Sequence, residues 1–220
     1  MGQIRKTLTF ILMIFISAFI VLVSMPGGIV NAAELDRITD YRIKVDMLED
    51  GSMSMEYTIQ WSVLSNSGGP LTWVKIGIPN NDADQIEALS PNIKKARYYT
   101  EGGGDYIRVD FNTSYRAGDS FTFKFSFVQH NMFEESGSRC YYNFTPGWFD
   151  EIKVSQYTIY WNADNVIEAD TAALIDGYYV WTGSLGFGQR THTRVVYSSD
   201  AYNYTYKNVF HGLSGFFDKL

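Results

Sequence analysis

Residues 41–63 read YRIKVDMLEDGSMSMEYTIQWSV, and this stretch decides the fold. Apolar side chains occupy every second position from Tyr41 to Met47 and again from Met53 to Val63. A period of two puts one set of side chains on a single face, which predicts two half-buried strands. Between them lies Glu49-Asp50-Gly51, where glycine accepts the positive φ of a tight turn. The stretch therefore predicts an antiparallel hairpin.

The same pattern continues in both directions from this hairpin. Four phenylalanines share one face between Phe121 and Phe127, and burying each ring is worth roughly 1.5–3 kcal/mol, so that face is expected in the core. Further strands are predicted at 71–78, 93–100, 106–111, 141–144, 152–161, 172–175, 178–181 and 191–197. Short strands separated by glycine-rich turns are typical of antiparallel sandwiches. We expect an all-β protein of two tandem immunoglobulin-like β-sandwiches after an N-terminal signal helix.

The domain boundaries follow from breaks in the alternation. Residues 132–140 are polar and poor in strand formers, which predicts a linker between a first sandwich at 33–131 and a second at 141–208. Residues 80–91 are also polar and are predicted as a loop with a short helical turn. The last residues, 209–220, carry apolar side chains at helical spacing and are predicted as a short amphipathic segment.

The N-terminus has the order of features found in a signal peptide. Arg5 and Lys6 precede an apolar run from Leu8 to Val23, and Ala32 ends a small-residue cleavage signal, so residues 1–32 are predicted to be removed after Ala32. An uncleaved anchor is the alternative, although the run is shorter than the roughly 20 residues that span a bilayer core. The remainder is expected outside the cytoplasm, secreted or at the cell surface.

Charge and cysteine content narrow the partners of the exported part. Removal of the signal takes Arg5 and Lys6 from the 18 basic residues and none from the 24 acidic ones, which leaves a net charge of −8. Such a chain as a whole has no electrostatic attraction for nucleic acid or anionic lipid. Cys140 is the single cysteine, so no internal disulfide can form.

The sequence offers little that points to catalysis. The three histidines, His130, His192 and His211, lie in no recognisable nucleophile or metal-ligand motif, so no catalytic residue, cofactor or metal ligand is assigned. Glu56 has no obvious carboxylate partner for glycoside hydrolysis.

One oxygen-rich loop keeps a metal alternative open. Asn80, Asp82 and Asp84 offer possible calcium ligands, but they lack the glycine and glutamate spacing of an EF-hand loop. A solvated loop is the preferred interpretation, and calcium binding stays undecided at this point.

The high aromatic content is the sequence feature that points most clearly to a binding function. The chain has 5 Trp and 16 Tyr, and adjacent pairs such as Tyr141-Tyr142 cannot both point inward from one strand. Exposed aromatic rings supply contacts to proteins and to sugar rings. The candidate ligand-contacting rings are Trp148, Tyr179, Trp181 and Tyr142.

The stretch from Ile38 to Val63, with its hairpin turn and Glu56 on the second strand, resembles the start of the exported β-sandwich region of bacterial predicted membrane proteins of the DUF2207 type. That resemblance implies a sandwich outside the membrane, followed by transmembrane helices, with no established catalytic residues. A membrane link would come through an uncleaved signal or through a C-terminal span beyond Leu220.

The function expected from the sequence is a non-catalytic binding or interaction protein of the cell envelope, contacting an envelope protein or a glycan. The alternative is a carbohydrate-binding module or a glycan-active jelly-roll enzyme, with Trp148, Tyr179 and Trp181 as stacking platforms.

Overall fold

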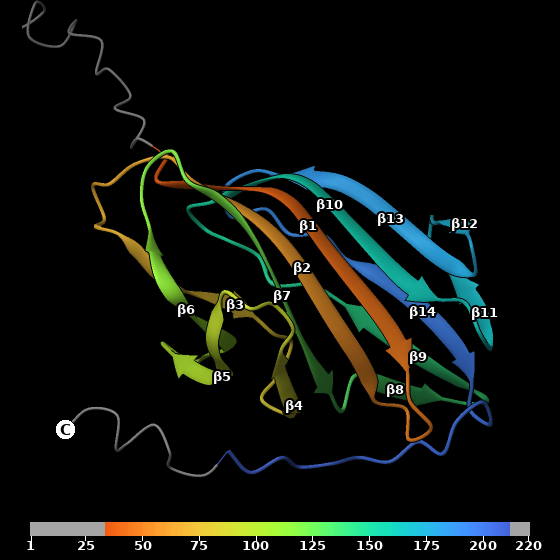
Figure 1. Cartoon of the computed structure of the whole chain (residues 1–220). Coiled ribbons are helices and arrows are strands. Elements are labelled where there is room, and N and C mark those ends of the chain that lie inside the picture. Colours follow the sequence, from red (N-terminus) through yellow and green to blue (C-terminus); the bar gives the residue numbers. More distant parts are fainter. Residues whose placement is uncertain (1–33, 212–220) are drawn as a thin grey trace, which may run out of the picture. The chain divides into compact units, whose positions relative to one another are not determined.

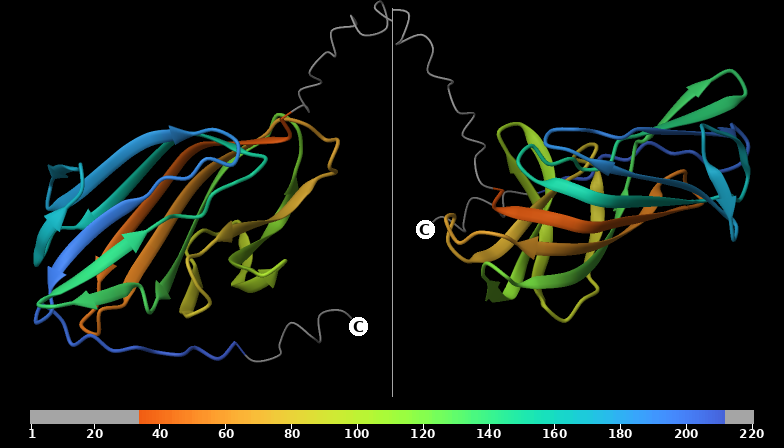
Figure 2. Two further views of the ribbon diagram at one scale, coloured as in Figure 1. Left: turned by 180° about the vertical axis from the view of Figure 1, so that it is seen from behind. Right: turned by 90° about the horizontal axis from the view of Figure 1, so that it is seen from above.

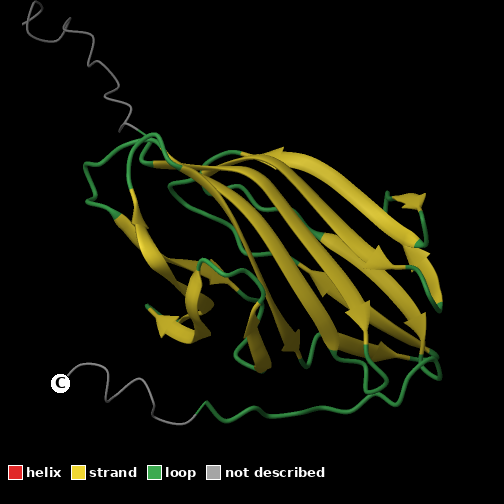
Figure 3. Ribbon diagram, viewed as in Figure 1, coloured by secondary structure: helices red, strands yellow, loops and turns green. Residues whose placement is uncertain are grey.

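A computed structural model describes residues 34–211 (Figures 1 and 3). The predicted signal peptide at 1–32, its cleavage position and the predicted C-terminal segment beyond His211 lie outside the described residues. The described chain is all-β, with fourteen strands in three sheets. In this range no helix is long and apolar enough to cross a membrane.

The strands group as follows. The seven-stranded sheet has the order β12 (Ala173–Ile175), β13 (Tyr178–Leu185), β10 (Lys153–Asn162), β1 (Asp36–Met47), β2 (Met53–Val63), β7 (Ser120–Gln129) and β4 (Ala83–Ala88). The four-stranded sheet has the order β11 (Val166–Ala169), β14 (Thr193–Ser198), β9 (Arg139–Phe144) and β8 (Phe133–Ser136). The three-stranded sheet has the order β3 (Leu71–Gly77), β6 (Gly104–Tyr115) and β5 (Ile93–Glu101).

The hairpin predicted at 41–63 is confirmed. Strands β1 and β2 pair antiparallel with Tyr41 opposite Ile59 and Met47 opposite Met53. Gly51 takes a φ of 78° in the turn, a conformation that L side chains rarely adopt. A side chain there would also meet the ring of Tyr204, so the turn needs glycine for two reasons.

Both smaller sheets pack on the same face of the seven-stranded sheet. Trp161 lies opposite Val45, which lies opposite Met55, which in turn lies opposite Phe127, so these four side chains share a face. The four-stranded sheet contributes Tyr142, Phe144 and Tyr197 against Trp161, and the three-stranded sheet contributes Phe111 against Phe123. The buried residues of all three sheets form one hydrophobic core.

The other face of the seven-stranded sheet is polar. Arg42 pairs with Asp40, and Lys124 pairs with Glu56 across neighbouring strands. These residues alternate with core residues, as expected for a sheet covered on one side only.

The predicted division into two tandem sandwiches differs from this arrangement. Strand β1, from the first predicted sandwich, pairs in parallel with β10, from the second, and both lie in one sheet. Within the described chain, residues 34–211 accordingly fall in one compact unit. The residues predicted as a linker, 132–140, form β8 and the start of β9, and the predicted loop at 80–91 contains β4. Polar composition misled both predictions, because short edge strands expose much of their surface.

After β14 the chain turns at residues 199–202 and then crosses the lower ends of the strands in Figure 1 without regular secondary structure (Figures 1 and 2). We call residues 199–211 the C-terminal strap. Its backbone amides at Asn203 and Thr205 donate to the carbonyl oxygens of Glu49 and Asp50. The side chain of Asn131 accepts a hydrogen bond from the Lys207 amide at 2.8 Å and donates one to the Lys207 carbonyl. The described start of the predicted amphipathic segment, 209–211, has no regular secondary structure.

Candidate functional site

Two of the four predicted ligand-contacting rings lie in the core, which corrects their assignment. Tyr142 has no exposed surface, and its hydroxyl donates to the carbonyl of Gly51 at 2.7 Å. Trp181 is buried, and its indole nitrogen donates to Asp170 at 3.0 Å. As expected for adjacent residues of one strand, only one ring of the Tyr141-Tyr142 pair faces outward. That ring is Tyr141, and Tyr142 points inward.

The other two predicted rings are not gathered into one surface. Tyr179 is half-buried, and its ring is tilted by 41° from that of Trp181 at a centroid separation of 6.5 Å. Trp148 is 38% exposed in the loop before β10, with the Arg190 guanidinium 3.8 Å above its ring. Tyr179 instead lies opposite Trp161, near the far end of β10. These rings do not form a coplanar exposed strip.

The oxygen-rich loop is occupied by hydrogen bonds. The Asn80 side-chain oxygen accepts from the Asp82 amide at 2.8 Å, and Asp82 accepts from the side chain of Asn131 at 2.6 Å. Asp84 lies 3.0 Å from His130 Nε2. Between residues 34 and 211, no group of three or more His, Cys, Asp and Glu side chains is arranged to hold a metal ion.

His130 links a serine and a carboxylate that lie far from it in the sequence. Its Nδ1 lies 2.6 Å from the Ser52 hydroxyl, and its Nε2 lies 3.0 Å from Asp84. The residue types match a catalytic triad, but the burial is reversed: Ser52 and His130 are each 2% exposed, whereas the Asp84 carboxylate is half-open to solvent. A substrate cannot reach the hydroxyl unless the hairpin at residue 52 moves, so the trio is best interpreted as a structural link.

The outward face of the three-stranded sheet carries a regular pattern of rings and charges. Directly opposite residues there form three cross-strand rows: Trp73–Asp110–Lys95, Lys75–Arg108–Arg97 and Gly77–Tyr106–Tyr99. With Glu101, which lies next along β5, we call this set the aromatic–basic face. All three rings are partly exposed. These residues face outward because side chains alternate between the two faces of a strand. The residues between them, which fill the core, are Val74, Ile76, Ile107 and Val109.

The rings and cations of this face hold one another in place. The Arg108 guanidinium lies 4.1 Å from the Trp73 ring centre and 5.7 Å from that of Tyr99. The two rings meet edge to face at 6.3 Å. Lys75 lies 4.9 Å from the centre of the Tyr106 ring. Cation–π contacts of this kind contribute about 0.5–1 kcal/mol at exposed sites and fix the direction of long side chains.

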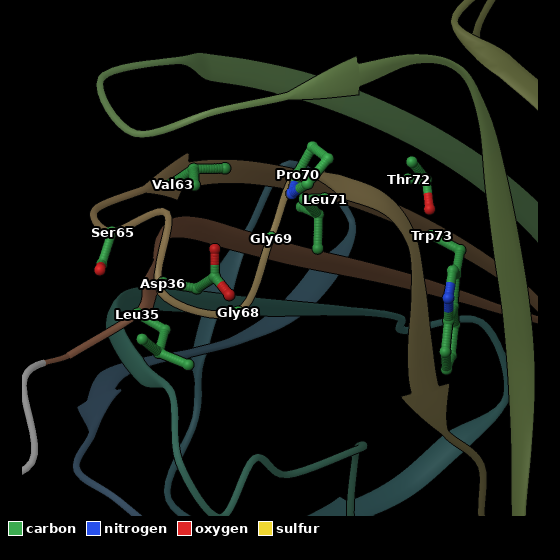
Figure 4. Close-up of a pocket in the computed structure, with 10 residues that line it drawn as sticks. All are labelled: Leu35, Asp36, Val63, Ser65, Gly68, Gly69, Pro70, Leu71, Thr72 and Trp73. Carbon is green, nitrogen blue, oxygen red and sulfur yellow. The ribbon is translucent and has the colours of Figure 1, made fainter.

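Trp73 also forms one wall of a pocket of about 280 Å³ at the start of β1 (Figure 4). Val63, Pro70 and Leu71 supply apolar walls. The carboxyl group of Asp36 is the ionisable group of the lining, and Figure 4 places it between Leu35 and the 68–71 segment.

Burial dominates the electrostatics of Asp36. Loss of water raises the pKa of this carboxyl group, and the hydrogen bond from Trp61 Nε1 at 3.0 Å opposes that rise. A carboxyl group with a raised pKa beside a pocket is a recognised sign of a functional site, although ion-pair networks perturb pKa values as well.

Sequence inspection missed the aromatic–basic face because its rings stand apart in the sequence, at 73, 99 and 106. A spacing of two residues would have found them, because residues two apart lie on the same face of a strand. Each ring is two residues from a Lys or Arg, in the pairs Trp73–Lys75, Arg97–Tyr99 and Tyr106–Arg108. Tyr142 and Tyr179 were predicted as ligand contacts because aromatic residues cluster near them in the sequence. Rings that are close in the sequence need not be close on the surface.

No protein-family model matches the chain, and no curated protein matches it in sequence. An M1 zinc metallopeptidase from Deinococcus radiodurans matches 74% of this chain and 42% of its own length, at 10% identity and a TM-score of 0.42. Native leukotriene A4 hydrolase from Saccharomyces cerevisiae matches 74% of this chain and 29% of its own length, at 12% identity and a TM-score of 0.45. The chain thus spans less than half of these structures, and likenesses of this strength carry no conclusion about its activity.

Proposed function

We propose that this chain is an exported binding protein of the cell envelope or cell surface that acts without catalysis, and that the aromatic–basic face is its contact surface. The observation that carries the proposal is the set of three partly exposed rings, Trp73, Tyr99 and Tyr106, which lie on one face of a sheet and contact neighbouring cations. Rings that are fixed in advance lose little conformational freedom on binding, which is why aromatic residues and arginine dominate binding hot spots.

The export part of the proposal is supported by the sequence of the N-terminus. Arg5 and Lys6, the apolar run up to Val23 and the small residues before Ala33 have the order of a cleaved signal. The test is expression of the full chain in a bacterial host, followed by fractionation and N-terminal sequencing. A mature chain that begins at Ala33 outside the cytoplasm is the expected result, and an intact cytoplasmic chain would remove the export proposal.

The absence of catalysis is supported by the placement of Ser52. Ser52 lies in the hairpin turn that the strap contacts, and its hydroxyl is buried against His130, so it is inaccessible to a substrate in the described structure. If Ser52→Ala abolished a hydrolase activity of the purified chain, this part of the proposal would be refuted.

The binding surface is tested by sedimentation with isolated bacterial envelopes. The full chain should sediment with envelopes, and the double variant Tyr99→Ala/Tyr106→Ala should remain in the supernatant. Tyr160→Ala is the matched control, because Tyr160 is also a partly buried strand tyrosine but lies on the seven-stranded sheet. Retention of the double variant at the level of the control would refute the assignment of this face.

A further inference from the structure

The middle row of the aromatic–basic face places three cations side by side. Lys75 lies directly opposite Arg108, and Arg108 lies directly opposite Arg97. Neighbouring strands are about 4.8 Å apart, so the three positions span roughly 10 Å across the sheet. Like charges directly opposite each other destabilise a sheet, which makes this row locally unfavourable for the fold. Residues that break a local rule of this kind often serve a function.

Acidic residues of the face form ion pairs with all three cations of the row. Asp110 pairs with Arg97 at 2.9 Å and with Arg108 at 2.8 Å, and Glu101 pairs with Lys75. Lys95 adds a fourth cation opposite Asp110. The face therefore carries four positive and two negative side chains, although the chain as a whole has a net charge of −6.

Rings flank the cation row on both sides along the strands. Trp73 lies in the row before it, and Tyr99 and Tyr106 lie in the row after it. A ligand that crosses the face thus meets an aromatic ring, then cations, then aromatic rings again. The face of a sugar ring is apolar and packs on aromatic rings, whereas its acid substituents pair with Lys and Arg. A polymer that repeats both groups matches this order better than an acidic peptide does, because a peptide carries its charges on flexible stems.

We propose that the aromatic–basic face binds an anionic polysaccharide, with acid groups on Lys75 and Arg97 and sugar rings on Tyr99 and Tyr106. The proposal rests on the proposed function, since it names the partner class of the same surface. Arg108 acts mainly as a positioning residue, because it is held between Trp73 and Tyr99 and bonded to Asp110.

The probe is polygalacturonate, a linear polymer with one carboxylate on each sugar. Binding to the full chain is measured by isothermal titration at low and moderate salt, beside neutral dextran, polyglutamate and polyphosphate. We expect binding to polygalacturonate alone, weakened by added salt because charge pairs at a surface are screened. Polyglutamate tests an acidic peptide, and polyphosphate tests charge without sugar.

Two sets of variants separate charge from stacking. The double variant Lys75→Gln/Arg97→Gln should weaken binding by roughly tenfold, which corresponds to about 1.4 kcal/mol. The double variant Arg42→Gln/Lys124→Gln makes the same charge change on the polar face of the seven-stranded sheet and should bind as the wild type does. Tyr99→Ala should weaken binding severalfold, and Tyr99→Phe should restore it. Circular dichroism confirms that each variant is folded.

Each other outcome overturns the inference in a distinct way. Equal binding of polyglutamate or polyphosphate would show that charge alone is recognised, and unchanged binding by folded Tyr99→Ala would exclude stacking. If polygalacturonate does not bind but envelopes still retain the chain through Tyr99 and Tyr106, the partner class is wrong and the proposed function stands. If neither binds, both proposals fall.

Discussion

Replacing Tyr197 with Phe should destabilise the protein, whereas the same replacement at Tyr57 should not. Both tyrosines have no exposed surface. The Tyr197 hydroxyl accepts a hydrogen bond from Trp161 Nε1 at 2.6 Å. The Tyr57 hydroxyl lies near that of Tyr41 but has no hydrogen-bond partner of acceptable geometry within the described chain. Both substitutions therefore remove a buried hydroxyl oxygen, but only the one at Tyr197 removes a hydrogen-bond partner.

The magnitudes follow from what each hydroxyl leaves behind. Tyr197→Phe leaves the Trp161 N–H buried and unsatisfied, which costs about 1–3 kcal/mol. Tyr57→Phe removes a hydroxyl whose desolvation is already uncompensated, so the free energy of unfolding should stay the same or rise by up to about 1 kcal/mol. For a chain of this length each kcal/mol shifts Tm by roughly 2–4 °C.

Urea unfolding followed by far-UV circular dichroism measures the difference. The m value should not change, because neither substitution alters the surface exposed on unfolding. If Tyr57→Phe lowered the free energy of unfolding as much as Tyr197→Phe does, the hydrogen-bond account of this core would be wrong.

Three further predictions concern the loops and the pocket. Gly147→Ala should cost about 1–3 kcal/mol, because a Cβ there would lie 2.5 Å from the Gly77 carbonyl oxygen, and thermal melting measures it. Asp36→Asn should remove one pH dependence of the free energy of unfolding. Because the pKa of Asp36 is raised, the folded state binds the proton more tightly, so wild-type stability falls as pH rises from about 4 through the folded pKa. The stability of the variant should not fall over this range. Asn131→Gly, which keeps the left-handed φ of 57°, should release the strap and speed tryptic cleavage after Lys207 severalfold.

Each of these predictions has a control within the chain. Gly68→Ala should melt with the wild type, since the nearest atom to its added Cβ is 3.8 Å away. Parallel pH profiles of wild type and Asp36→Asn would contradict the burial argument. Tryptic cleavage at Arg116, in an exposed turn, should keep its rate in Asn131→Gly, so a general increase in cleavage would point to unfolding instead.

Period-two patterns predicted the strands that are buried on one face. The pairing of β1 with β2 and the inward phenylalanines of β7 were readable because their alternation is strict and their partners are near in sequence. The parallel pairing of β1 with β10 was not readable, since nothing local records a neighbour more than one hundred residues away.

The candidate site was less predictable than the fold. Strand parity shows that one of two adjacent rings faces outward, but it does not say which one, and Tyr142 faces inward because it meets Trp161 and the carbonyl of Gly51. The cation row depends on the register of β3, β6 and β5. Register is set by turns and bulges whose geometry the residue pattern alone does not fix.

The parallel partnership of β1 and β10 also sets the order in which the chain can mature. Until residues 153–162 have been made, the edge of β1 that pairs with β10 has no partner strand, and Tyr41 lacks its neighbours on β10. Contacts of such long sequence separation fold slowly and leave strand edges open to aggregation in the meantime. A chain that is synthesised from its N-terminus therefore leaves the edge of β1 open to wrong pairing until β10 has been made.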